Sequence, residues 1–315
     1  MTTHFSKNKV VPFVFFLLYF MGIAAFMPFM VLYFQDLGFS GAQIGVLTGI
    51  PPLITLVTVP MWTRAADHTG RYRLIMTISL LVTAVCVLIY PMMGTFTAVL
   101  ILTLTINLFF GPSFSLANSA TMYMLGEEKD IYGRLRVGGS IGFGIATVIA
   151  GALVERFDLR VAFWMGAAFI LGSYLVSLML VYGQEEVETA DEDADIQHLL
   201  RRPNWIVFLL LAFIGGVAMA AFNSYFFPYM SELGAAETAM GVALAVGIIS
   251  EVPVLLSSNR FFARFGGYGT MVLSTAIIGL RMILFGLVQN TLGVMLIQML
   301  NGLSIPLFMV AGVYY

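Results

Sequence analysis

Residues 24–46 read AAFMPFMVLYFQDLGFSGAQIGV, and residues 220–242 read AAFNSYFFPYMSELGAAETAMGV, which is the same stretch 196 positions further along the chain. The copies share an Ala-Ala-Phe triplet, a tyrosine, an acidic residue followed by Leu-Gly, and a Gly-Val pair. The offset continues through the next loop with three further pairs: Arg64 and Arg260, Gly70 and Gly266, Tyr72 and Tyr268. Chance similarity between apolar segments rarely keeps its register through polar loops. We therefore predict a membrane protein built from two parallel copies of one helical bundle.

The amino-acid composition supports a membrane location. Hydrophobic residues make up 60% of the chain and charged residues 10%, whereas about a quarter of a soluble domain is charged. Residues 10–34 contain no charged side chain and are long enough to cross ~30 Å of hydrocarbon as a helix. This first run is too long for the apolar core of a secretory signal, so we interpret it as a retained helix.

The apolar runs predict an all-α protein with about ten membrane-spanning helices, because barrel strands would be about half as long and would alternate. The predicted spans are 10–34, 42–62, 73–93, 96–125, 137–154, 161–182, 205–229, 239–257, 268–288 and 292–315. We expect residues 1–183 to form a six-helix bundle, the acidic stretch 184–204 to be a cytoplasmic linker, and residues 205–315 to form an incomplete four-helix bundle. The second copy stops within its fourth helix, so we expect the last two helices of a twelve-helix protein to be missing.

Basic residues indicate the orientation. If successive helices alternate in direction, one side holds Lys7, Lys9, Arg64, Arg71, Arg73, Lys129, Arg134, Arg136, Arg201, Arg202, Arg260 and Arg264. The other side holds Arg156 and Arg160. The positive-inside rule then places the N-terminus in the cytoplasm, and we expect a multi-pass protein of the cell inner membrane.

Several classes of function find little support. A net charge of −2 argues against a nucleic-acid partner, and the lone Cys86 excludes an intrachain disulfide. The three histidines, His4, His68 and His198, are too scattered to predict a metal site in the membrane. Because no nucleophile elbow or phosphate-binding loop is found, an integral membrane enzyme is disfavoured. We expect a monomer without a cofactor, whose partners are a small-molecule solute, the proton and membrane lipids.

Two ionisable residues lie deep in predicted spans, Glu251 in the eighth and Arg281 in the ninth. Either charge costs roughly 2.5–3.5 kcal/mol at a helix centre, so neither is incidental. Counted from the outer helix ends, they lie at depths of roughly 18 Å and 12 Å, a difference that an arginine side chain spans. One interpretation is a structural ion pair. The other is a coupling site, where the carboxylate takes up and releases a proton and the guanidinium pairs with it or with a substrate.

Uncharged polar residues in the spans are candidates for lining the same cavity, namely Asn107, Ser113, Asn118, Asn223, Tyr225, Gln298 and Asn301. For each of them, a hydrogen bond between helices is the alternative role. Gly138 and Gly142 form a small-xxx-small pattern in the fifth span, which predicts close helix packing.

The loop at residues 62–73 reads WTRAADHTGRYR. It resembles the signature loop of the major facilitator superfamily, in which an acidic residue is followed by glycine and basic residues. Asp67, Gly70 and Arg71 fit that pattern, while Thr63 and His68 depart from it. The resemblance implies a fold of two bundles, in which this loop helps to latch a cytoplasmic gate against the eleventh helix. Anchoring at the lipid headgroups is the alternative role for its arginines.

Four further motifs are Pro28-Phe29 with Leu32-Tyr33-Phe34, Gln43-Ile44-Gly45, Tyr132-Gly133-Arg134-Leu135-Arg136 and Gly139-Ser140-Ile141-Gly142-Phe143. They look like the branch of the superfamily that contains phenylpropionate permease-like and lactose permease-like symporters. This resemblance implies alternating access and proton-coupled uptake, with Glu251 and Arg281 in substrate binding or proton coupling and Arg134 and Arg136 in a cytoplasmic gate. The ionisable residues that lactose permeases carry in helix ten have no counterpart in residues 291–315.

The sequence therefore predicts a secondary transporter, with solute:proton symport as the first hypothesis. A facilitator or exporter that uses no proton is the alternative. A drug antiporter is disfavoured because the fourth span has no arginine, and residues 134–160 contain no proline and thus no Gly-Pro pair.

Overall fold

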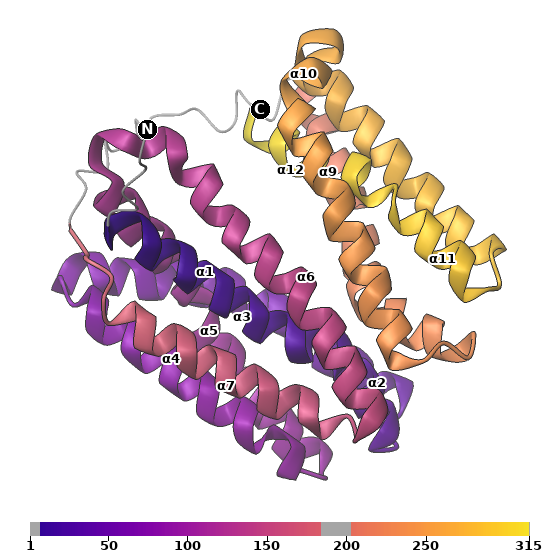
Figure 1. Ribbon diagram of the computed structural model, residues 1–315, viewed down its shortest axis with the longest axis horizontal. Coiled ribbons are helices and arrows are strands. Elements are labelled where there is room, and N and C mark those ends of the chain that lie inside the picture. The colour runs from indigo at the N-terminus through magenta and orange to yellow at the C-terminus, as the bar shows by residue number, and fades with distance from the viewer. Residues whose placement is uncertain (1–6, 184–202, 315) are drawn as a thin grey trace. The chain divides into compact units, whose positions relative to one another are not determined.

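The computed structural model describes residues 7–183 and 203–314, and the regular elements in those ranges are helices (Figure 1). They form two compact units, Met1–Glu186 and Val187–Tyr315. Within the described ranges, nine helices are long and apolar enough to cross a membrane, and one bent pair makes a possible tenth span. The predicted all-α class is confirmed. Most of the predicted linker, 184–204, lies outside the described residues, and its last two residues begin a helix.

Unit 1 is a bundle of apolar helices joined by short turns. Its elements are α1 (Lys7–Phe26), η1 (Met27–Phe29), α2 (Met30–Asp36), α3 (Gly41–Thr69), α4 (Tyr72–Ile89), η2 (Tyr90–Met92), α5 (Phe96–Leu125), η3 (Gly126–Ile131), α6 (Tyr132–Arg156) and α7 (Arg160–Ser177). Helix α1 packs against α6 and α7, α4 packs against α5 and α7, and α3 packs against α5.

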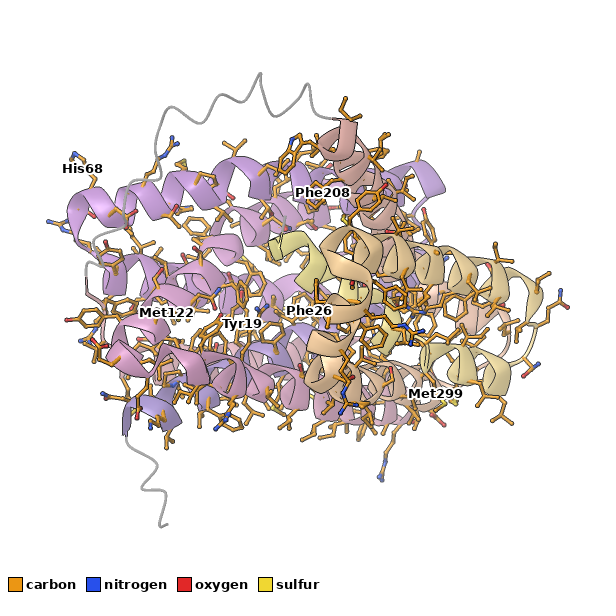
Figure 2. All side chains as sticks on the ribbon, turned by 90° about the horizontal axis from the view of Figure 1, so that it is seen from above. Tyr19, Phe26, His68, Met122, Phe208 and Met299 are labelled. Atoms are coloured by element: carbon orange, nitrogen blue, oxygen red, sulfur yellow. The ribbon has the colours of Figure 1, made fainter. Side chains whose placement is uncertain are left out.

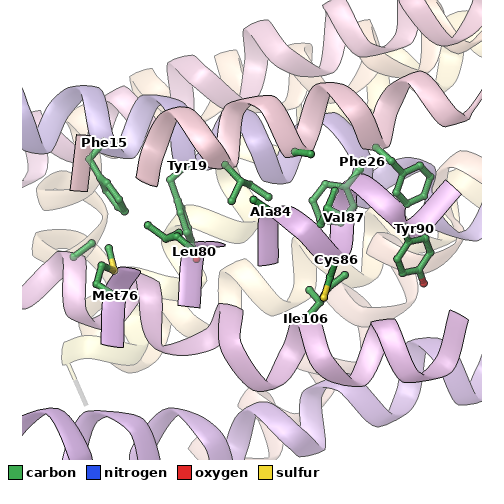
Figure 3. Packing of buried hydrophobic residues seen from close by; sticks show 14 of the residues in the cluster. Phe15, Tyr19, Phe26, Met76, Leu80, Ala84, Cys86, Val87, Tyr90 and Ile106 are labelled. Carbon is green, nitrogen blue, oxygen red and sulfur yellow. The ribbon is translucent and has the colours of Figure 1, made fainter. Parts of the chain in front are cut away.

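Aromatic and aliphatic side chains together fill the interior of unit 1 (Figure 3). The ring of Tyr90 stacks on Phe163 with centroids 5.1 Å apart, and its hydroxyl shares a 2.7 Å hydrogen bond with the Thr103 hydroxyl. Tyr19 stacks on Phe110 with centroids 5.0 Å apart. These contacts join α1, η2, α5 and α7, so stacked aromatic rings help to hold the bundle together.

Close packing of α1 on α6 depends on glycine, as the small-xxx-small pattern predicts. A Cβ atom on Gly138 would lie 2.8 Å from the carbonyl oxygen of Phe13, and one on Gly142 would overlap the carbonyl oxygen of Leu17. Because the obstacles are backbone atoms, they cannot rotate away. The prediction of close helix packing at these two positions is confirmed.

Unit 2 contains α9 (Pro203–Glu232), α10 (Glu237–Leu287), α11 (Thr291–Gln298) and α12 (Asn301–Tyr314). Helix α10 covers two spans, Glu237–Val254 and Arg260–Leu287, and its backbone leaves the helical region at Gly266, where φ is 66° and ψ is 177°. A positive φ of this kind is readily adopted only by glycine. Helix α10 packs against α9, α11 and α12.

The sequence repeat is also a repeat of local geometry. Gly38 and Gly234 both have φ of 74°, and Gly70 and Gly266 have φ of 65° and 66°. The turns that contain the first pair have the same amide hydrogen bonds, with Leu37, Gly38 and Phe39 donating as Leu233, Gly234 and Ala235 do. The turn at Gly38 and Gly234 therefore repeats in its φ angle and its hydrogen bonds. The second pair shares φ but not ψ, which is 8° at Gly70 and 177° at Gly266.

Candidate functional site

A buried arginine marks the candidate site in unit 2. Arg281 is 1% exposed and is among the largest fully buried side chains of the described residues. Its Nη1 donates to Asn301 Oδ1 at 2.8 Å and to Ser304 Oγ at 2.7 Å, and its Nη2 donates to Gln298 Oε1 at 2.7 Å. The planar guanidinium presents its donors in fixed directions, so three neutral acceptors around the end of α11 and the start of α12 seat the cation.

Two aromatic rings complete the seat of Arg281. The Cζ atom lies 5.3 Å from the ring centroid of Phe222, on α9, and 5.8 Å from that of Phe285, on α10. A ring face attracts a cation through its quadrupole, and the attraction grows when water is excluded. The Nε atom of Arg281 is buried and has no hydrogen-bond partner in the structure. The guanidinium is thus desolvated, and the groups in direct contact with it are neutral dipoles and ring faces.

Glu251 joins the same network through an amide. It lies in the Glu237–Val254 span of α10 and is partly exposed. Its Oε1 accepts a 2.7 Å hydrogen bond from Asn301 Nδ2, while Asn301 Oδ1 accepts from Arg281. Both charged side chains belong to the described part of the chain, yet no direct ion pair joins them. Asn301 stands between carboxylate and guanidinium with its donor toward one and its acceptor toward the other.

The helix that carries these acceptors corrects a prediction. We expected one continuous span over residues 292–315, but α11 and α12 meet at an angle of 42°. At the break, a side chain enters the helical hydrogen-bond ladder, because the amide of Gly302 donates to Ser250 Oγ at 2.9 Å. Insertion of a side chain between an amide and its helical carbonyl is a recognised origin of sharp kinks. Gln298 and Asn301 flank this break.

The other predicted cavity residues lie outside the network. Asn107 donates to the carbonyl of Thr103 in its own helix at 2.8 Å, and Asn118 Oδ1 accepts from the hydroxyl of Tyr132 at 2.7 Å. Ser113, also in unit 1, is buried with its hydroxyl unpartnered. On α9, Asn223 is exposed and Tyr225 is 58% exposed. Of the seven candidates, the structure brings Gln298 and Asn301 together with Glu251 and Arg281.

Sequence reasoning missed four members of the site. Two of them have a signal in the helical spacing: Phe285 follows Arg281 by one turn, and Ser304 follows Asn301 by three residues. Ser250 is adjacent to Glu251, but serine is common in membrane helices. Phe222 comes from another helix, α9, and is brought in only by tertiary packing.

The predicted gate residues lie at helix ends of unit 1. Asp67 accepts a 2.9 Å hydrogen bond from the hydroxyl of Tyr72, and Gly70 ends α3 with φ of 65°. Arg71 precedes α4 and is exposed, as is Arg134 at the start of α6. Arg136 places its Cζ 5.2 Å from the ring centroid of Phe114. The turn around Asp67 is thus preorganised by a hydrogen bond and a left-handed glycine.

Contacts show that several of these helix ends share one end of unit 1. Lys9 Nζ lies 2.6 Å from Glu128 Oε2, which joins the start of α1 to η3. Arg73 Nη2 donates to the carbonyl of Leu180 at 3.3 Å, which joins the start of α4 to the segment after α7. His68, near the end of α3, points away from the packed side chains (Figure 2).

Comparisons with known proteins agree with this architecture. The family model described as "MFS_1 like family" matches residues 13–315. The maltose permease of Geobacillus stearothermophilus is 25% identical over 98% of this chain and 79% of its own length. The probable 3-phenylpropionic acid transporter of Escherichia coli (strain K12) is 25% identical over 81% of this chain and 68% of its own. The crystal structure of the nucleoside transporter NupG (D323A mutant) superposes with a TM-score of 0.83 at 20% identity, covering 97% of this chain and 81% of that one.

Proposed function

Because the chain belongs to the MFS_1 like family of the major facilitator superfamily, whose members are secondary transporters, we propose that it couples the movement of a small organic solute to that of a proton by alternating access. The protein is a transporter and not an enzyme. We assign the coupling role to Glu251 and Arg281 and place the protein in the cell inner membrane. The observation that supports this proposal is the Glu251–Asn301–Arg281 chain of hydrogen bonds.

The chemistry of the chain favours coupling over a purely structural role. A carboxylate only accepts hydrogen bonds, whereas a protonated carboxyl also donates one. When Glu251 takes up a proton, the hydrogen bond from Asn301 Nδ2 loses its charged acceptor and weakens. Since the same amide supplies an acceptor to Arg281 through Oδ1, a change at the carboxyl group reaches the guanidinium. Proton binding and the state of the Arg281 seat are therefore linked through one side chain.

The membrane environment favours the protonated, neutral form of Glu251. A charged carboxylate in the hydrocarbon costs roughly 2.5–3.5 kcal/mol, and protonation removes that cost. Glu251 is partly exposed, so its carboxylate is the group of the pair that can exchange a proton, while Arg281 keeps its charge because a guanidinium is not deprotonated in proteins. A site that closes only when the carboxyl is neutral moves a proton together with its solute.

A proton-flux assay tests the proposal. The protein is reconstituted into liposomes without a pH gradient, and maltose, 3-phenylpropionate or uridine is added outside, these being representatives of what the relatives are named for. Symport predicts alkalinisation of the outside medium on addition of one of these solutes, in step with its uptake. Uptake without a pH change indicates a facilitator, and acidification of the outside indicates exchange of the solute for protons. Either result contradicts symport.

A further inference from the structure

The break between α11 and α12 is built around one hydroxyl. Ser250 Oγ accepts from the amide of Gly302 at 2.9 Å and donates to the carbonyl of Gly247 at 2.6 Å. The carbonyl of Gln298, which would be the helical partner of the Gly302 amide, is left 3.5 Å from the same hydroxyl. Because a hydroxyl has a single hydrogen, its donated bond goes to Gly247. The serine therefore separates the amide and carbonyl that a continuous helix would join.

Proline does not account for this break. Pro306 lacks an amide hydrogen, but the carbonyl this frees belongs to Gly302, four residues earlier and beyond the break. Gly302 itself permits the contact, since a Cβ atom there would overlap the carbonyl oxygen of Ser250. The two helices approach closely enough for a short serine side chain to enter the ladder only because this position is a glycine.

The first copy of the repeat provides an internal comparison. Its fourth helix, α5, runs without interruption over Phe96–Leu125. The position 196 residues before Ser250 is Ile54, which has no hydroxyl. The positions equivalent to Glu251 and Arg281 are Thr55 and Val85. The break and the two buried charges thus occur together in one copy and are both missing from the described helices of the other.

The break also explains how three acceptors reach one guanidinium. Around it the amides of Met299, Leu300 and Leu303 bond to carbonyls three residues earlier, which is the 3₁₀ pattern. In that pattern side chains three residues apart eclipse one another. Gln298, Asn301 and Ser304 have this spacing and all accept from Arg281. In a straight α-helix the first and third of them would diverge by about 120°.

We propose that Ser250 is a positioning residue: its hydroxyl holds the helix broken, and the break aligns Gln298, Asn301 and Ser304 on Arg281 and brings Asn301 to Glu251. The proposal deepens the assigned coupling site and rests on that assignment for its importance to transport. The contact itself can be tested without any solute.

The test uses N,N′-dicyclohexylcarbodiimide, which labels protonated carboxyl groups. The full chain in liposomes is labelled over a range of pH, and mass spectrometry then measures the labelled fraction of the peptide that contains Glu251. The midpoint is the pH at which this fraction is half its maximum. Asn301→Ala removes the hydrogen bond to the carboxylate, and Ser250→Ala is expected to displace Asn301 from it. Each variant should therefore move this midpoint by about one pH unit. If Ser250 acts through Asn301, the double variant moves the midpoint no further than Asn301→Ala alone.

Two controls isolate the hydroxyl. Ser257 lies on the same helix, is similarly half-buried, and donates to the carbonyl of Pro253 in its own helix, so Ser257→Ala should keep the parental midpoint. Ser250→Thr retains a hydroxyl and should also keep it. A parental midpoint in Ser250→Ala, an additive shift in the double variant, or a Ser250→Thr midpoint that follows Ser250→Ala would each overturn the proposal.

The design stays informative if one variant folds poorly. Should Ser250→Ala fail to reach the membrane, Ser250→Cys replaces it, because a thiol keeps the shape but is a weak hydrogen-bonding group, and the same outcomes apply. Failure of the coupling role is distinguishable: a Glu251→Gln variant that still accumulates solute would remove the functional assignment while leaving the labelling shifts intact. Unshifted labelling beside lost accumulation in Glu251→Gln would remove only the role of Ser250.

Discussion

At the scale of single residues, the neutral seat of Arg281 predicts that lysine cannot replace it. An ammonium is a point charge that cannot reach Gln298, Asn301 and Ser304 in the directions that the guanidinium fork uses. Each buried acceptor left without a partner costs about 1–3 kcal/mol. Arg281→Lys should lower the thermal unfolding temperature in detergent and weaken solute binding. Arg264→Lys, at an exposed position, should change the free energy of unfolding by less than about 0.5 kcal/mol. Equal effects of the two substitutions would count against the seat.

The carboxylate can be tested by an isosteric change. Gln keeps an oxygen that accepts from Asn301 Nδ2 but cannot exchange a proton. Glu251→Gln should therefore abolish accumulation of solute against a gradient, reducing the ratio of inside to outside concentration to one, while sparing exchange of solute for solute. Both are measured in liposomes with the solute identified by the proton-flux assay. Glu232→Gln, at an exposed helix end, is the matched control. Accumulation at the parental level in Glu251→Gln would exclude a coupling role.

Only part of this site could be predicted from the types of residue in the sequence. Glu251 and Arg281 stand out because charge is expensive in an apolar span, and Gln298 and Asn301 stand out as amides in the same setting. Ser250 carries no such signal, since serines in membrane helices usually bond to their own backbone, as Ser257 does. Its role depends on which helix lies opposite, and hydropathy does not contain that information.

At the scale of helices, two glycines of α6 make a matched pair. A Cβ atom on Gly142 would overlap the backbone of α1, whereas one on Gly144 meets nothing within 4 Å. Gly142→Ala should lower the free energy of unfolding in detergent by about 1–3 kcal/mol, because the helices must move apart. Gly144→Ala should be neutral or stabilising by up to about 1 kcal/mol through helix propensity. Circular dichroism during titration with a denaturing detergent measures both, and similar destabilisation by the two would contradict the close approach.

The helices themselves were largely predictable, because continuous apolar runs of sufficient length have few alternatives in a bilayer. Several observed spans, such as Phe96–Glu128 against the predicted 96–125, agree to within a few residues. Larger differences occur at the end of Gly41–Thr69, predicted as 42–62, and at the start of Arg260–Leu287, predicted as 268–288. The tenth span was predicted without the break between α11 and α12. A hydrogen bond to another helix lies at its break. Residues 292–315 include the glycine that permits this contact, Gly302, but not the Ser250 hydroxyl that makes it.

At the scale of the whole molecule, the predicted orientation awaits a direct test. Cys86, the sole cysteine, is 7% exposed, so a membrane-impermeant maleimide should not label the parental protein in intact cells. With the N-terminus in the cytoplasm, Gly94→Cys, in the exposed turn before α5, should be labelled from outside. His68→Cys should be labelled only after the membrane is opened. Labelling of position 68 in intact cells would show that the N-terminus lies outside the cell, contrary to the prediction.

The copies of the repeat agree in the turn at Gly38 and Gly234. They differ in their charges, with Thr55 and Val85 in one where the other has Glu251 and Arg281. This pattern is what gene duplication followed by divergence leaves behind: the scaffold is inherited twice, and the costly groups are retained or acquired once. A chimaera that joined two first halves would keep the ancestral backbone but would carry no carboxylate or guanidinium at these positions. Ancestral reconstruction of the unduplicated bundle would show whether those charges were lost from one half or gained by the other.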